Sequence, residues 1–158
     1  MSYSDAIDSL IERITKVAVT FDAGHPFHTH EDDAGEVVDI EAIPDDVTRV
    51  FDLRMVSAPE DAGGSGFGLH RFRVAMQLRV RYMAHPRGRV ERQIGHDVPR
   101  LINALIHPAH PVPWRSIDTI EPPGRPELMA LTNGGADAAY ALVIRVPFTM
   151  HFIDRQED

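Results

Sequence analysis

One stretch of the sequence constrains the fold more than any other: residues 68–83 read GLHRFRVAMQLRVRYM. Every second residue from Phe72 to Tyr82 is apolar. Because successive side chains of a β-strand point to opposite faces of a sheet, this pattern predicts one long strand with an apolar face and a basic face. The arginines of the basic face are Arg71, Arg73, Arg79 and Arg81.

Other segments supply partners for this strand. Residues 50–57 alternate in the same way, so we expect them to form a long hairpin with residues 69–83. Residues 114–131 predict two short strands separated by a Pro-Gly interruption, and residues 141–153 predict a closing strand. Pro147 lies in that last strand and cannot donate to a ladder. It therefore predicts either an edge strand or a position whose donor side faces outward.

Two segments have helical periodicity instead. Apolar residues recur at helical spacing from Ile7 to Phe21, with Ser2 or Ser4 as a possible cap, and Gly24 with Pro26 ends the pattern. A second helix is predicted over residues 90–107, with Pro99 inside it. This proline predicts either a kink or a fresh helix start capped by Asp97.

These elements predict an α+β fold: an antiparallel sheet with two amphipathic helices packed on one face. At 158 residues we expect a single domain spanning 1–158. Two irregular segments interrupt it, namely a long acidic excursion at about 22–46 and a flexible Gly-rich hairpin loop at 58–68. The arginine face of the long strand would then be the uncovered face of the sheet.

Charge is distributed unevenly along the chain, whose net charge is −8. Residues 22–61 contain twelve acidic and two basic residues, whereas residues 70–100 contain eight arginines and two acidic residues. Two explanations stay open: the segments neutralise each other within one chain, or the acidic segment of one copy meets the arginine face of the next. The acidic balance disfavours indiscriminate binding to nucleic acid or to a membrane surface.

Cysteine is absent, which excludes disulfides, thiolate metal sites and cysteine nucleophiles and fits synthesis in a reducing cytoplasm. The sequence GHPFHTHEDD places His25, His28 and His30 close together, and imidazoles on one strand face bind divalent metals well. The H-x-H pair is similar to that of cupins, but no second ligand motif follows. We interpret the segment as a polar loop and expect no cofactor. A small metal-dependent enzyme using these histidines stays an alternative.

The order of elements resembles the tail terminator proteins of long-tailed bacteriophages. The resemblance covers the first helix, the hairpin VFDLRMVS…HRFRVAMQLRVRYM, the second helix ending LINALIH and the last strand ALVIRVPFTMHFI. The acidic excursion at 22–46 has no counterpart in the family pattern. Other neck or tail-tube proteins of similar topology stay alternatives.

The resemblance implies a structural virion protein without catalysis, made in the host cytoplasm and located in the phage tail. Its partners would be its own copies in a hexameric ring, the tail tube protein and the neck or connector proteins. Contact with passing DNA would be passive at most. We therefore expect Arg71, Arg73, Arg79 and Arg81 to face solvent in the monomer and a partner subunit in the assembly.

Overall fold

The computed structural model describes residues 3–19, 24–29, 40, 48–65, 69–107, 109–132 and 139–155. In chain order its elements are α1 (Tyr3–Thr15), β1 (Val50–Met55), β2 (Glu60–Ser65), β3 (Leu69–Met83), α2 (Arg87–Ile106), β4 (Ile117–Ile120), β5 (Glu127–Thr132) and β6 (Ala139–Arg155).

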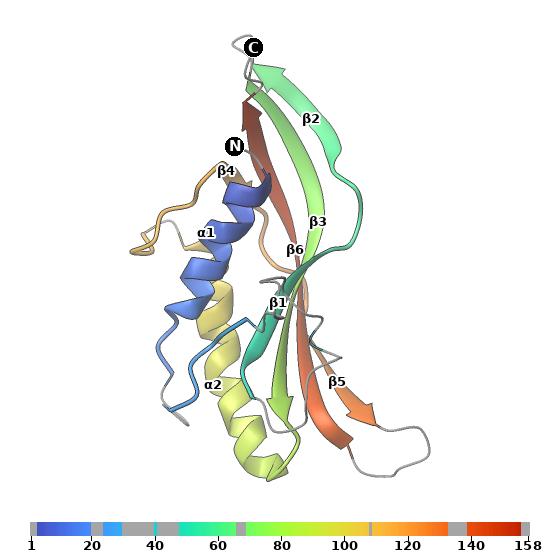
Figure 1. The fold of residues 1–158 in the computed structure, drawn as a ribbon. Helices are drawn as coiled ribbons and strands as arrows, with labels where there is room; N and C mark the ends of the chain where they lie inside the picture. Colours follow the sequence, from blue (N-terminus) through green and yellow to red (C-terminus); the bar gives the residue numbers. More distant parts are fainter. Residues whose placement is uncertain are drawn as a thin grey trace, which may run out of the picture.

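The six strands form one open antiparallel sheet, with β3 and β6 paired along their length at its centre. β1 and β2 pair with the free side of β3, and β4 and β5 pair with the free side of β6. Both helices lie against the same face of this sheet (Figure 1). The predicted α+β fold is confirmed.

The main core lies between the helices and the sheet, as the alternation of β3 and β6 predicts. The inward residues of the two central strands are Phe72, Val74, Met76, Leu78, Val80, Tyr82, Leu142, Ile144, Val146, Phe148, Met150 and Phe152, and all but the partly buried Phe72 are buried. From α1 and α2 the core receives Ala6, Leu10, Ile14, Val90, Leu101 and Leu105. A long central strand pair of this kind gives the helices a continuous apolar surface to cover.

The Gly-rich segment differs from the expected flexible loop, because β2 lies inside it and pairs with β3. Glycine is a poor strand former, so composition alone indicated a loop. The register shifts between Asp61 and Gly64, and Gly63 has a φ of 101°. Glycine reaches this conformation without strain, which lets the strand bulge and continue along β3. Residues 66–68 lie outside the described residues.

Pro147 lies in a central strand, so the edge-strand interpretation is wrong. β4 pairs with β6 from Met150 to Phe152 and β5 from Ala139 to Arg145, so Pro147 falls in the gap between the two partners. The Gly124 N–H donates to the Pro147 carbonyl over 2.8 Å. Because N–H and C=O of one strand residue point to the same side, the missing donor of Pro147 faces this gap rather than β3.

The first helix is shorter than its periodicity indicates. α1 ends at Thr15, and the Val17 N–H donates to the Ile14 carbonyl over 3.0 Å in a tight final turn. Ser4 lies within the helix and is not its cap, while Ser2 and Phe21 lie outside the described residues.

The second helix runs through Pro99 as one element, and Asp97 is not an N-cap. The residue before the helix is Pro86, which makes no side-chain capping bond. Asp97 instead points into the protein, where it is buried. A buried carboxylate requires charged or polar partners, and Asp97 has one in the buried Arg49.

Candidate subunit interface

Arg71 and Arg73 lie on the outer face of the sheet, which is the face opposite the helices. Their side chains are 48% and 51% exposed, in agreement with the predicted solvent-facing position. Arg71 Nη2 lies 2.7 Å from Asp118 Oδ2, and Arg73 Nη2 lies 3.8 Å from Glu121 Oε2. These ion pairs join β3 to the opposite edge of the sheet across β6, and each arginine keeps about half of its surface for another partner.

Arg79 and Arg81 do not face solvent, so the prediction is wrong for these two residues. Arg79 forms a fork with the carboxylate of Asp52 on β1, with 2.9 Å between Nε and Oδ1. Arg81 donates to the Ile40 carbonyl over 2.8 Å, and its guanidinium lies 5.6 Å from the centroid of the Tyr140 ring. Alternation predicts the face to which a side chain points, but another segment of the same chain can still cover that face.

A small second core provides this cover. Ile40, Val50 and Val143 are buried together on the outer face, with Leu131 packed against them. This cluster lies beside Arg81, because Val50 and Val143 are its cross-strand neighbours on β1 and β6. Arg71 and Arg73 lie away from this cover and stay half-exposed, and Arg54 on β1 and Glu127 on β5 are also exposed on the outer face.

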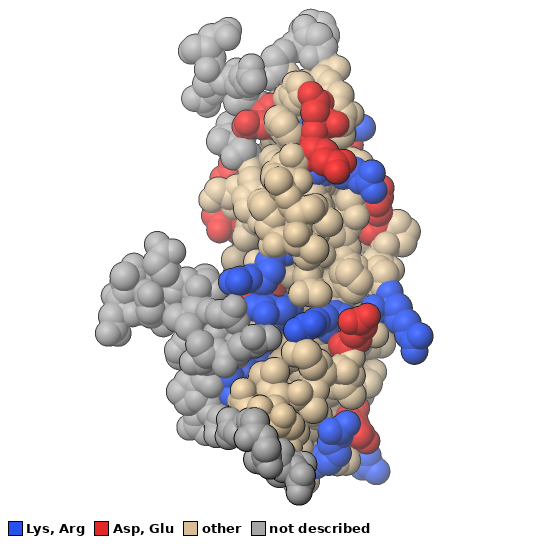
Figure 2. All heavy atoms as spheres, turned by 90° about the vertical axis from the view of Figure 1, so that its right-hand side faces the viewer, with Lys and Arg blue, Asp and Glu red and all other residues tan. Residues whose placement is uncertain are grey.

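Charges on the outer face are matched across the strands. In register, Asp52, Arg79, Arg145 and Glu127 form one row across β1, β3, β6 and β5. Figure 2 shows basic side chains gathered across the middle of this face, with acidic side chains beside them. Asp52 belongs to the acidic segment and Arg79 to the basic one, so part of the charge asymmetry is neutralised within the chain. Asp52 opposite Arg79 and Glu127 opposite Arg145 stabilise the strand pairing at the two ends of the row, whereas Arg79 and Arg145 in its centre are like charges opposite each other.

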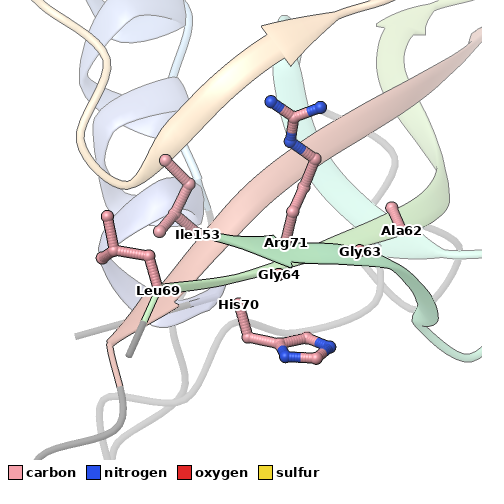
Figure 3. Close-up of a pocket in the computed structure, with 7 residues that line it drawn as sticks. All are labelled: Ala62, Gly63, Gly64, Leu69, His70, Arg71 and Ile153. Carbon is pink, nitrogen blue, oxygen red and sulfur yellow. The ribbon is translucent and has the colours of Figure 1, made fainter. Parts of the chain in front are cut away.

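A recess of about 370 Å³ lies at the end of the β2–β3 hairpin and is lined by Ala62, Gly63, Gly64, Leu69, His70, Arg71 and Ile153. His70 and Arg71 leave β3 on opposite sides of the sheet (Figure 3). His70 Nε2 lies 2.8 Å from Asp61 Oδ2. The pKa of Asp61 is lowered mainly by a hydrogen bond from the Gly63 N–H and, to a smaller extent, by the bond to His70. The histidine and the arginine therefore do not converge on one point of the recess (Figure 3).

The histidines of the acidic excursion take different positions. The His25 carbonyl accepts a bond from Arg49 over 3.1 Å. His28 forms a parallel bridge with Val50, and its Nδ1 lies 3.1 Å from the Pro26 carbonyl. His30 lies outside the described residues. Within the part of the chain that is described, no three His, Cys, Asp or Glu side chains form a group able to hold a metal ion.

A buried polar cluster that the sequence did not reveal connects three distant parts of the chain. Arg49 donates from Nε to Asp97 Oδ2 over 2.8 Å and from Nη2 to Asp97 Oδ1 over 3.3 Å. The Tyr82 hydroxyl donates to the same Oδ2 over 2.8 Å. The pKa of Tyr82 is raised well above its usual value of 10, mainly by burial and to a smaller extent by the negative charge of Asp97. The cluster fixes the segment before β1 against α2 and β3.

Three large hydrophobic side chains are exposed among the residues that the structure describes: Met55 at 43%, Val56 at 62% and Leu128 at 49%. Met55 and Val56 lie at the end of β1, on one edge of the sheet. Leu128 lies on β5, on the other edge. The β1 edge is partly occupied, because His28 bonds to Arg49 and Phe51; a free stretch of sheet edge is a template for pairing with another chain. The two edges are thus different surfaces with similar apolar character.

No protein-family model matches this sequence, and no curated protein matches it either. Among the described residues, no helix is long and apolar enough to cross a membrane.

Proposed function

We propose that this chain is a structural subunit that assembles head to tail into a closed ring, of the kind that ends the tail tube of long-tailed phages and joins it to the head or neck. The support is the α+β fold with an open sheet, together with the resemblance in element order. In this proposal the protein acts by assembly in the virion, with the tail tube and connector proteins as its further partners.

The observation that carries the proposal is the placement of exposed apolar side chains on both edges of one sheet. A contact between the β1 edge of one copy and the β5 edge of the next would bury Val56 and Leu128 together. Such a contact is heterologous, and it closes into a ring when the rotation between neighbours fits a whole turn. Each buried leucine-sized side chain contributes about 1.5–3 kcal/mol.

Arg71 and Arg73 have a second role in this proposal. They are half-exposed on the outer face, where they can meet acidic groups of a neighbouring subunit as well as Asp118 and Glu121. Charge complementarity of this kind orients the partners more than it adds affinity. Assembly should therefore weaken as added salt screens these exposed charges.

Native mass spectrometry of the purified chain tests the proposal. The expected result is a closed oligomer, six times 17.6 kDa by the resemblance to tail terminators, that appears as a ring in electron micrographs. Elemental analysis of the same sample addresses the metal-enzyme alternative, which predicts a metal-loaded monomer or dimer. A metal-loaded chain that stays monomeric at every concentration contradicts the proposal.

A further inference from the structure

The backbone of β1 has a free stretch on the side that faces away from β3. Val56 donates its N–H to the Ala75 carbonyl of β3 over 2.8 Å. Because the backbone groups of successive strand residues point to opposite sides, the N–H and C=O groups of Leu53 and Met55 point away from β3. Phe51 continues this series, and its N–H donates over 3.0 Å to the short segment beside the start of β1. Among the described residues, none bonds to the outward groups of Leu53 and Met55.

β5 has a matching free stretch on the side that faces away from β6. The Pro147 carbonyl of β6 accepts a bond of 2.8 Å from the segment just before β5, so its backbone groups point to the β5 side. Arg145 lies two residues away on the same strand, points to the same side and pairs with Glu127. Leu128 and Ala130 alternate with Glu127, so they direct their N–H and C=O groups away from β6, where no described residue bonds to them.

The side chains of these two free stretches are apolar. Met55 lies opposite Met76 and Leu128 opposite Ile144, so both belong to the face of the sheet that carries the helices. They are nevertheless 43% and 49% exposed. Proteins protect a free sheet edge with charged residues, prolines or bulges, because unpaired backbone groups recruit another strand. The four residues with free groups here are uncharged and lie in regular register, so these stretches are suited to receive a strand.

We infer that the free stretch of β1 in one copy pairs through its backbone with the free stretch of β5 in the next copy, so that two subunits share one continuous antiparallel sheet. This inference rests on the proposed function, since it specifies how the two edges of that contact meet. β1, β3, β6 and β5 alternate in direction, so β1 and β5 run in opposite directions. Two copies in nearly the same orientation therefore bring these edges together as an antiparallel pair, with their helices on one side of the shared sheet.

The register of this pairing follows from which backbone groups are free. Met55 opposite Leu128 and Leu53 opposite Ala130 let all four residues exchange backbone hydrogen bonds across the contact. A shift by one residue would oppose free groups with groups that already bond within the sheet of each copy. A shift by two residues would either place Pro126, which has no N–H, opposite Met55 or leave Leu128 beyond the end of β1. The register with Met55 opposite Leu128 also packs these two exposed side chains against each other.

Charges on the outer face fit the same register. Glu127 would lie opposite Val56 and diagonal to Arg54 of the next copy, at a separation that long side chains span. Glu127 is exposed, and Arg54 is exposed although it also has an interaction within its own chain. Opposite charges across a contact fix its orientation and register more than they add affinity. Another copy of the chain therefore offers a free apolar stretch of the right direction together with an acidic residue near Arg54.

Substitution at Met55 tests the backbone pairing, because the N–H of this residue has no partner within the described chain. Met55→Pro removes this N–H and turns the proline ring toward the neighbouring copy, without removing a bond to β3. Met55→Ala is the matched control, since it shortens the same side chain and keeps the N–H. In analytical ultracentrifugation Met55→Pro should assemble with a dissociation constant at least about tenfold higher than Met55→Ala, because the Leu128 carbonyl stays unpaired. Circular dichroism shows whether both variants are folded.

Amide hydrogen exchange of the wild type, resolved to single residues, is the second measurement and needs no variant. The amides of Leu53, Met55, Leu128 and Ala130 should exchange more slowly in the assembled chain than in the monomer, because each gains a hydrogen bond. The Met129 amide is the internal control. It is directed toward β6, so it should be protected in both states.

The outcomes separate this inference from the proposed function. A wild-type ring whose four amides exchange as fast as in the monomer overturns the shared sheet while ring formation stands. A folded Met55→Pro variant that assembles as tightly as Met55→Ala does the same. A wild-type chain that stays monomeric at every concentration overturns the proposed function and this inference with it.

Discussion

Single residues decide whether the buried polar cluster holds the fold together. Asp97 forms a buried ion pair with Arg49, so its removal takes a carboxylate partner away from a buried charge. Breaking such a pair by removing one partner costs about 3–5 kcal/mol. We predict that Asp97→Ala lowers the free energy of unfolding by this amount in urea titrations. Glu91→Ala, an exposed carboxylate on the same helix, should change it by less than about 0.5 kcal/mol.

A second prediction at the scale of residues concerns how the Tyr82 hydroxyl affects stability at alkaline pH. Because the pKa of Tyr82 is raised in the folded protein, the unfolded chain releases this proton first as the pH rises above about 10. Tyr82 thus stabilises the fold fully below pH 10, and this contribution is lost at higher pH. Tyr82→Phe should show a shallower alkaline decline in melting temperature than the wild type. Parallel declines would show that Tyr82 ionises as an exposed tyrosine does.

The arginines show what a sequence pattern can predict at this scale. Alternation assigned all four to one face correctly, because that depends only on the geometry of a strand. It missed the burial of Arg79 and Arg81, because their partners Asp52 and Ile40 come from other parts of the chain. The pairing of Arg49 with Asp97, which are 48 residues apart, has no local signal either. Reversing Arg79 would therefore place two negative groups together in a buried site and test folding rather than assembly.

At the scale of elements, sequence periodicity predicted β1, β3, β4, β5, β6 and α2. The sequence-based predictions were wrong where tertiary packing overrides the local preference of the residues, as in β2 and at Pro147. β2 forms from a Gly-rich sequence because β3 extends beyond β1 and offers a free edge. Pro147 is tolerated in a central strand because the two partners of β6 leave a gap at that point. Neither feature is visible without knowing which strands are neighbours.

Gly124 provides the element-scale prediction, because it fits against that gap. A Cβ at Gly124 would lie 2.9 Å from Cγ of Pro147, a ring that cannot rotate away. We predict that Gly124→Ala destabilises the fold by about 1–3 kcal/mol through overpacking. Gly95→Ala is the control with the opposite sign. Gly95 lies within α2 with open space around it, and alanine there should stabilise the helix by up to about 1 kcal/mol. Thermal unfolding of both variants distinguishes these effects.

At the scale of the whole molecule, the first explanation of the uneven charge, neutralisation within one chain, holds in part, and contact between copies stays a prediction. Asp52 of the acidic segment pairs with Arg79 of the basic segment and neutralises charge inside the chain. Arg71 and Arg73 on the outer face keep basic groups at the surface.

The central claim is that two different edges of one sheet meet head to tail. Val56→Asp should block the β1 edge and Leu128→Asp the β5 edge, so each variant alone should sediment as a folded monomer. Burying an unpaired charge at an interface costs several kcal/mol.

The most direct test is to mix these two variants and measure the product by analytical ultracentrifugation. Each variant keeps the edge that the other has lost, so the mixture should form a one-to-one dimer that does not grow further. Wild-type chain in the same buffer should form the ring. If the mixture stays monomeric while the wild type assembles, or if either variant alone still forms the ring, the sheet edges are not the subunit contact.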